Sequence, residues 1–162
     1  MTGKAFVYGD NVDTDLLAPG IYMKGSVEAL AEHCLEAIDR DFATSVQPGD
    51  FVVGGRNFGM GSSREQAAQV LRIKGVQAVI ARSFGGIFYR NAFNLGLPAL
   101  VCAAVDKIGK DDVLDVDMAA GIIRNQTTGE RIACDPVPEH LMNIVRAGGL
   151  ISWLEVRGAR QS

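Results

Sequence analysis

Two serines and an arginine stand side by side in a glycine-rich segment of the 162-residue chain. The segment runs from Gly54 to Ala67 and carries Ser62-Ser63-Arg64 near its end. Glycines let the backbone approach a ligand closely and adopt positive φ. Arg64 offers a planar guanidinium that grips a carboxylate through two hydrogen bonds. A helix that starts here adds free N–H groups that favour an anion. These residue types indicate a site for a small anionic ligand.

A purely structural role for the same residues is the alternative. Ser62 with Glu65, or Ser63 with Gln66, fits a capping box at a helix start. In that case Arg64 is only a solvated residue of the first helical turn. Two phosphate-binding patterns do not match: the chain has no G-x-x-x-x-G-K-[ST] run, and Arg64 replaces the third glycine of a dinucleotide fingerprint. A Rossmann-like nucleotide binder is therefore disfavoured.

The segment joins a short apolar strand to an amphipathic helix, and open α/β sheets bind ligands at the carboxyl ends of their strands. Strands and helices alternate up to residue 105, which predicts parallel pairing with helical crossovers. The fold class is thus α/β: a single domain over residues 1–162, with a mixed, partly parallel β-sheet flanked by helices and added β-hairpins. The expected strands are 5–8, 51–53, 76–81, 98–105, 113–116, 122–124 and 131–134, and the expected helices are 26–38, 64–74, 84–95 and 138–147.

Composition narrows the classes of function. The formal net charge is −3, without a cluster of Lys and Arg, so we expect no nucleic-acid surface. The longest apolar stretches are far below the ~18 residues of a membrane span, and the N-terminus lacks a signal-peptide core. We therefore expect a cytoplasmic protein with no membrane contact. The cysteines and histidines lack metal-ligand spacing, so we expect no metal on this chain; they are Cys34, Cys102, Cys134, His33 and His140.

Three blocks of the sequence resemble the swivel domain of the aconitase superfamily. They are Gly9-Asp10-Asn11-Val12-Asp13-Thr14-Asp15, then Gly55-Arg56-Asn57-Phe58-Gly59-Met60-Gly61-Ser62-Ser63-Arg64-Glu65, then Ala81-Arg82-Ser83-Phe84-Gly85-Gly86-Ile87-Phe88-Tyr89-Arg90-Asn91. The blocks stand in the order that the family has. A free-standing domain of this length is similar to the small subunits of the superfamily's two-chain hydro-lyases.

The resemblance implies a hydro-lyase that is active only with its large subunit. That subunit would carry a 4Fe-4S cluster with one iron open to the substrate, in agreement with the lack of cluster ligands here. The substrate would be a hydroxy diacid such as isopropylmalate, whose 2- and 3-hydroxy forms interconvert by dehydration and rehydration in leucine biosynthesis. Homoaconitase and methylmalate-type hydro-lyases are alternatives. A non-catalytic module that binds a partner or a small anion is the alternative from another class.

The family's pattern also implies roles for single residues. Ser62 would be the base that removes the proton next to a carboxylate, and Ser63 and Arg64 would hold substrate carboxylates. Since a serine hydroxyl is a poor base, its alkoxide needs nearby positive charge and N–H donors. Asp15 and Thr14 would support these groups from the N-terminal block.

Further residues are expected around this centre. Met60 and Gln66 depart from the family, because many members have Cys and His there. Residues 21–25 match a substrate-reading loop, in which Lys24 would meet the variable end of the substrate. A solvent-facing Lys24 is the alternative, since a charge on a flexible apolar stem suits either role. Asp13 is as suited to bonding its own turn. We expect Phe84, Ile87, Phe88 and Phe93 in the core, and Arg82, Ser83 and Arg90 at an interface or behind the site.

Overall fold

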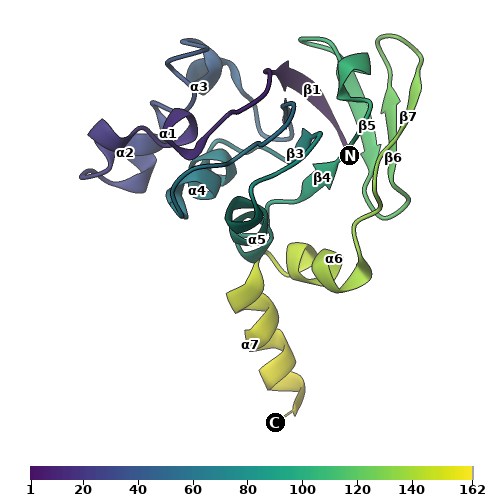
Figure 1. Ribbon diagram of the computed structural model, residues 1–162. Helices are drawn as coiled ribbons and strands as arrows, with labels where there is room; N and C mark the ends of the chain where they lie inside the picture. The colour runs from purple at the N-terminus through teal and green to yellow at the C-terminus, as the bar shows by residue number, and fades with distance from the viewer. Residues whose placement is uncertain (162) are drawn as a thin grey trace.

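The computed structural model describes residues 1–161 and is built on a seven-stranded sheet with the order β4-β3-β2-β1-β5-β6-β7 (Figure 1). Strands β1 to β4 are parallel, whereas β5, β6 and β7 run antiparallel on the other side of β1. The predicted mixed α/β fold is confirmed. The strands are β1 (Thr2–Val7), β2 (Phe51–Val53), β3 (Ala78–Ala81), β4 (Ala99–Val101), β5 (Val113–Asp117), β6 (Ile122–Asn125) and β7 (Arg131–Ala133).

The parallel half of the sheet forms the centre of the core. Every residue of β2 and β3 is buried, as expected of parallel strands covered on both faces. Val52 pairs with Phe6 on one side and with Val79 on the other. Helices α4 (Gln66–Ile73) and α5 (Gly86–Asn94) make the crossovers between these strands. The strand predicted over 98–105 is shorter, since the chain leaves β4 and turns into the 3₁₀ helix η2 (Val105–Lys107).

The segment between β1 and β2 forms short helical elements. Ser26 caps α2 as predicted, since its Oγ accepts from the Ala29 N–H (3.1 Å). The helix predicted over 26–38 is nevertheless too long. Leu35 takes φ +62°, and its N–H donates to the Leu16 carbonyl (2.9 Å), outside the helix. The apolar spacing persists beyond the helix because Leu35 is still buried. The elements are α1 (Thr14–Leu17), η1 (Gly20–Tyr22), α2 (Val27–Ala31) and α3 (Phe42–Ser45).

The antiparallel half contains the predicted hairpins. At the turn that follows β6, Asn125 is 1% exposed. Its amide nitrogen donates to the Asp112 carboxylate (2.8 Å) and to the Lys107 carbonyl (3.2 Å). Its amide oxygen accepts from the N–H groups of Thr127 and Thr128 (3.1 and 3.2 Å). This buried amide therefore joins the β6–β7 turn to the start of β5.

The sheet curls until its two ends meet. Just after β7, the N–H of Asp135 donates to the carbonyl of Val101 in β4 (2.8 Å). Helix α6 (Glu139–Arg146) follows and agrees with the predicted closing helix. The sequence pattern did not predict α7 (Leu150–Gln161), which extends away from the sheet (Figure 1). Its apolar side chains Ile151, Leu154 and Val156 are exposed, so they do not follow the pattern of a packed helix.

Candidate active site

The three family-like blocks meet at the carboxyl ends of β1, β2 and β3. The loop after β2 lies between the loops that follow β1 and β3, and it is bonded to both. Backbone hydrogen bonds run from the Gly55 N–H to the Gly9 carbonyl (3.0 Å), from the Gly59 N–H to the Val12 carbonyl (2.7 Å) and from the Phe58 N–H to the Ser83 carbonyl (3.0 Å). Segments that are far apart in the sequence thus form one continuous edge.

Short polar side chains complete the support of the middle loop. Asp10 accepts from the Arg56 N–H (2.7 Å), and the Ser83 hydroxyl accepts from the Asn57 N–H (2.9 Å). The Asn57 amide also donates to the amide oxygen of Asn11 (3.1 Å). The sequence motifs alone do not predict this role for Asp10 and Asn11. Their position in a polar turn directly after a strand is the signal that marks them.

Two glycines permit the close approach of these loops. A Cβ on Gly55 would overlap the carboxylate of Asp10. Gly59 takes φ +78°, and a Cβ there would overlap the ring of Phe88. The packing of the middle loop against its neighbours therefore requires glycine at both positions.

Ser62 and Ser63 are exposed in the loop that precedes α4. The N-cap of α4 is Glu65, and no side chain caps this helix. The predicted capping box is therefore wrong, and Arg64 does not lie in the first helical turn. The loop continues past the serines, and the helix begins only at Gln66, so neither hydroxyl is at the capping position. Both serines are left free of a capping role.

The Ser62 hydroxyl faces Thr14 instead. The distance between Ser62 Oγ and Thr14 Oγ1 is 3.2 Å, and either hydroxyl can donate. Thr14 is 3% exposed, and its N–H donates to the Met60 carbonyl (2.9 Å). Thr14 is therefore held rigidly at the start of α1 and presents its hydroxyl to Ser62. The supporting role that the resemblance implied for Thr14 stays a prediction.

Arg64 is held by the N-terminal block. Its Nη1 donates to Asp15 Oδ1 (3.0 Å) and to the Ala18 carbonyl (3.1 Å). The same Asp15 oxygen accepts from the Gly20 N–H (2.9 Å). The Gly20 N–H and then the Arg64 guanidinium lower the pKa of Asp15 below its ordinary value of 3.8. An ionised Asp15 thus holds the guanidinium against the N-terminal block.

Lys24 lies in an exposed turn just after η1. It lines a hollow of about 250 Å³ together with Tyr22 and His33. Ile21, on the same loop, is 83% exposed. The loop is therefore accessible to a ligand, and the specificity role of Lys24 stays a prediction.

Asp13 and most of the apolar residues in and just before α5 take the positions expected of them. Asp13 is the N-cap of α1 and accepts from the Leu16 N–H (2.8 Å), so its turn role is confirmed. Phe88 and Phe93 are buried, and Phe84 packs against the core, as expected. The core prediction for Ile87 is wrong, because this side chain is 48% exposed. The buried face of α5 is formed by Phe88, Ala92 and Phe93, and Ile87 falls outside it.

The arginines and Ser83 of the third block, expected at an interface or behind the site, have local partners. The Arg82 Nη2 lies 3.4 Å from an oxygen of Asp106, and the Arg90 Nε donates to the Gly86 carbonyl (3.4 Å). Ser83 supports the middle loop, as described above. The interface role of these residues stays a prediction.

The cysteines do not form a cluster-binding set. Within residues 1–161, no group of three or more His, Cys, Asp or Glu side chains could hold a metal. Burial raises the pKa of the thiols of Cys34 and Cys102, and it raises that of Cys134 to about 11. Iron–sulfur clusters take thiolate ligands. Among residues 1–161 the cysteines are not gathered into such a ligand set.

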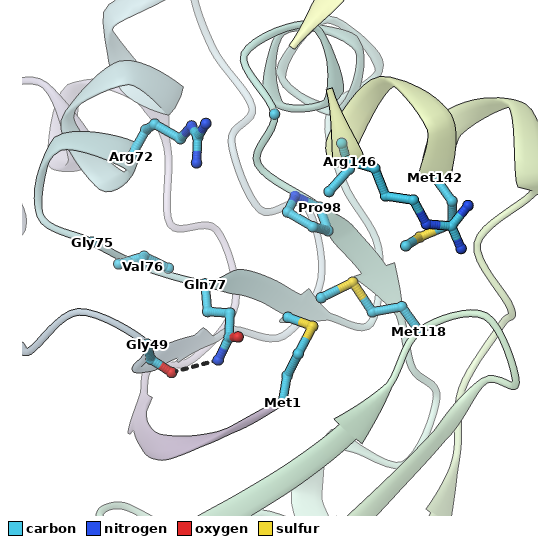
Figure 2. Close-up of a pocket in the computed structure, with 12 residues that line it drawn as sticks. Met1, Gly49, Arg72, Gly75, Val76, Gln77, Pro98, Met118, Met142 and Arg146 are labelled. Atoms are coloured by element: carbon cyan, nitrogen blue, oxygen red, sulfur yellow. Dashed lines mark hydrogen bonds between the residues drawn. The ribbon is translucent and has the colours of Figure 1, made fainter. Parts of the chain in front are cut away.

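A groove of about 400 Å³ lies at the opposite end of the parallel strands, near their amino ends (Figure 2). Met1, Met118 and Met142 contribute to its apolar lining, and Gln77 donates to the Gly49 carbonyl there (2.8 Å). Its described lining residues include no carboxylate or hydroxyl side chain. The polar groups suited to chemistry therefore lie at the carboxyl edge.

No helix among residues 1–161 is long and apolar enough to cross a membrane.

Comparison with known proteins agrees with this geometry. The model of the aconitase C-terminal domain matches residues 16–104, and the chain belongs to this family. Its full-length similarity is to 3-isopropylmalate dehydratase small subunits. The chain is 43% identical to small subunit 1 of Thermotoga maritima, over 97% of this chain and 96% of the relative. It is 47% identical to small subunit 2 of Archaeoglobus fulgidus, over 98% and 96%. The crystal structure of 3-isopropylmalate dehydratase from Methanocaldococcus jannaschii has a TM-score of 0.93 at 40% identity, covering 99% of this chain and 96% of the other.

The lowered pKa of Asp15 predicts how stability near the site depends on pH. Above its ordinary value of 3.8 the ionised carboxylate stabilises the fold, and this contribution is lost as the pH falls through the lowered folded-state pKa. The Tm of the wild type should therefore exceed that of Asp15→Asn at neutral pH, and the difference should shrink at acid pH. Thermal unfolding followed by circular dichroism measures both values. The control is Asp41→Asn, an exposed carboxylate outside the site that makes no cap hydrogen bond to α3. A difference that is the same at about pH 3 and pH 7 would contradict the prediction.

Proposed function

We propose that the chain is the small subunit of a 3-isopropylmalate dehydratase, which interconverts 2- and 3-isopropylmalate by dehydration and rehydration in leucine biosynthesis. The observation that carries the proposal is the open loop Ser62-Ser63-Arg64. Neither serine caps α4, and the guanidinium of Arg64, the next residue in the chain, is held by Asp15. Near full-length similarity to 3-isopropylmalate dehydratase small subunits supports the same function.

The proposal includes a large subunit that covers the carboxyl edge, with this chain acting as one swivel domain. Both serines are exposed, and apolar side chains at the same edge face solvent: Ile21 (83% exposed), Met60 (46%) and Ile87 (48%). A partner chain that buried them would also exclude water from the serines, which strengthens the electrostatic interactions of the site. We assign a 4Fe-4S cluster to that partner, where its open iron would supply Lewis-acid assistance to the leaving hydroxide.

Ser62 is the proposed base. It takes the proton from the carbon next to a carboxylate, and the electron pair of that C–H bond becomes the C=C bond as the C–O bond to the hydroxyl breaks. Rehydration reverses these steps with the hydroxyl on the neighbouring carbon. The Thr14 hydroxyl, 3.2 Å from Ser62 Oγ, can donate to the alkoxide and so stabilise it. Burial of Thr14 keeps this donor in place.

Arg64 and Ser63 are the proposed carboxylate-binding groups. Arg64 uses Nη1 for Asp15 and Ala18, and its planar guanidinium has further N–H donors for a substrate carboxylate. The Asp15 carboxylate fixes the plane of the guanidinium before the substrate binds. Preorganised charge of this kind costs little reorganisation during the reaction. The exposed Ser63 hydroxyl is adjacent in the chain and can bond the same carboxylate.

Reconstitution tests the function. The chain alone should show no turnover, because it carries half of the site. Anaerobic mixing with a cluster-containing large subunit should produce activity on isopropylmalate, measured against a panel that includes homoaconitate-type and methylmalate-type diacids. Activity of the small subunit by itself, or a reconstituted complex that prefers another diacid of the panel, would overturn the proposal.

Ser62→Ala tests the base. In the reconstituted complex kcat should fall by about 10²–10⁴, the range for a positioned acid–base group. The variant should keep its fold, since Ser62 is exposed and caps no helix. The matched control is Ser45→Ala, which removes an exposed hydroxyl from α3. A Ser62→Ala complex with near-normal kcat would leave the serine without a catalytic role.

Lys24→Val tests the substrate-reading loop. If the ammonium meets the variable end of the substrate, its removal should favour isopropylmalate over a diacid with a distal carboxylate. The ratio of the two kcat/KM values should shift by about 5–100-fold, as expected of a pocket contact. Lys110→Val, an exposed lysine outside the loop, is the control. An unchanged ratio would place Lys24 in solvent, with selection left to other residues.

A further inference from the structure

Two aromatic rings stack on each other within residues 20–33, a segment that carries Lys24 and is named here the Lys24 loop. Tyr22, at the end of η1, and His33, beyond α2, are stacked with centroids 3.6 Å apart and planes 7° from parallel. The chain between them contains Lys24 and the whole of α2. The stack therefore joins the two ends of this segment and limits how far Lys24 can move.

A carboxylate holds the stack in place. His33 Nδ1 lies 2.8 Å from Glu36 Oε2, and the side chains are only about one-third exposed (34% and 37%). The negative charge of Glu36 is also the first cause of the raised pKa of Tyr22. The segment is tied to the core just beside it, because the buried Leu35 donates its N–H to the Leu16 carbonyl (2.9 Å). Tyr22, His33 and Glu36 thus form one unit, named here the Tyr22 clamp.

The other end of the loop is joined to the proposed carboxylate-binding arginine. Gly20 opens η1 and donates its N–H to Asp15, which accepts from Arg64. A Cβ on Gly20 would lie 3.4 Å from Arg64 Nη2, so η1 starts in direct reach of the guanidinium. Arg64 therefore sets where the loop begins, and the Tyr22 clamp sets where it returns to the core.

We propose that the Tyr22 clamp positions the Lys24 loop over the variable end of the substrate, and that His33 is a positioning residue for substrate selection. This inference rests on the proposed function and deepens it. A loop that is ordered before binding loses little freedom when the substrate arrives. In the proposed reaction, no residue of the Lys24 loop transfers a proton. Its contacts should be equal in the ground state and the transition state, so losing the clamp should raise KM and leave kcat unchanged.

His33→Ala and His33→Phe in the reconstituted complex test the proposal. With isopropylmalate, His33→Ala should raise KM by about 3–10-fold, with kcat within about 2-fold of the wild type. His33→Phe keeps a flat ring over Tyr22 but loses the contact with Glu36, so its KM should lie between those of the wild type and His33→Ala. The matched control is His140→Ala, the second histidine of the chain, which is exposed on α6.

Proton NMR of the isolated full-length chain tests the stack without any assay. The chain has two histidines, so His33→Ala identifies the His33 ring signals by difference, and His140 is the internal reference. Replacing Tyr22 by Leu should move the His33 signals downfield, because a stacked ring shields the protons over its face. Unmoved signals would overturn the clamp. A wild-type complex that is active but shares its KM with His33→Ala would overturn the positioning role alone. A wild-type complex that is inactive on every diacid would overturn both proposals.

Discussion

The site depends on the hydrogen bonds that join the loop after β2 to the loops after β1 and β3. This loop has no regular structure of its own, and its N–H groups at Gly55, Phe58 and Gly59 are paired by the loops after β1 and β3. Buried backbone groups left unpaired would cost free energy. Parallel strands bring their carboxyl ends to one edge of the sheet, so the three loops lie within hydrogen-bonding distance of one another. The position of Ser62 follows from this pairing.

The sequence predicted what local patterns encode. The apolar run 51–53 is β2, and Ser26 caps a helix as its position predicted. Two of the errors concern residues whose partners are remote in the chain. Ser62 has the spacing of a helix cap, but its hydroxyl faces Thr14, 48 positions away. The apolar spacing around Leu35 continues the pattern of a helix, yet Leu35 is held by Leu16. Such partners are set by the sheet and cannot be read from a local window.

The proposed site has a centre held by hydrogen bonds and an exposed loop at its margin. Arg64 and Asp15 form the centre, where we propose that the diacid binds through a carboxylate. The loop from Gly20 to His33 forms the margin and begins on the same Asp15. Changes in the loop can therefore alter the fit to a side chain while the carboxylate contact is preserved.

The central place of β1 has a consequence during synthesis of the chain. β1 is made first, yet it pairs with β2 on one side and with β5 on the other. About 60 residues separate the end of β2 from the start of β5, which corresponds to about 3–12 s at 5–20 residues per second on the ribosome. Throughout that interval one edge of β1 has no strand beside it. A nascent chain of this fold therefore carries an unsatisfied strand edge for seconds, which is an opening for chaperone binding or for misassembly between neighbouring chains.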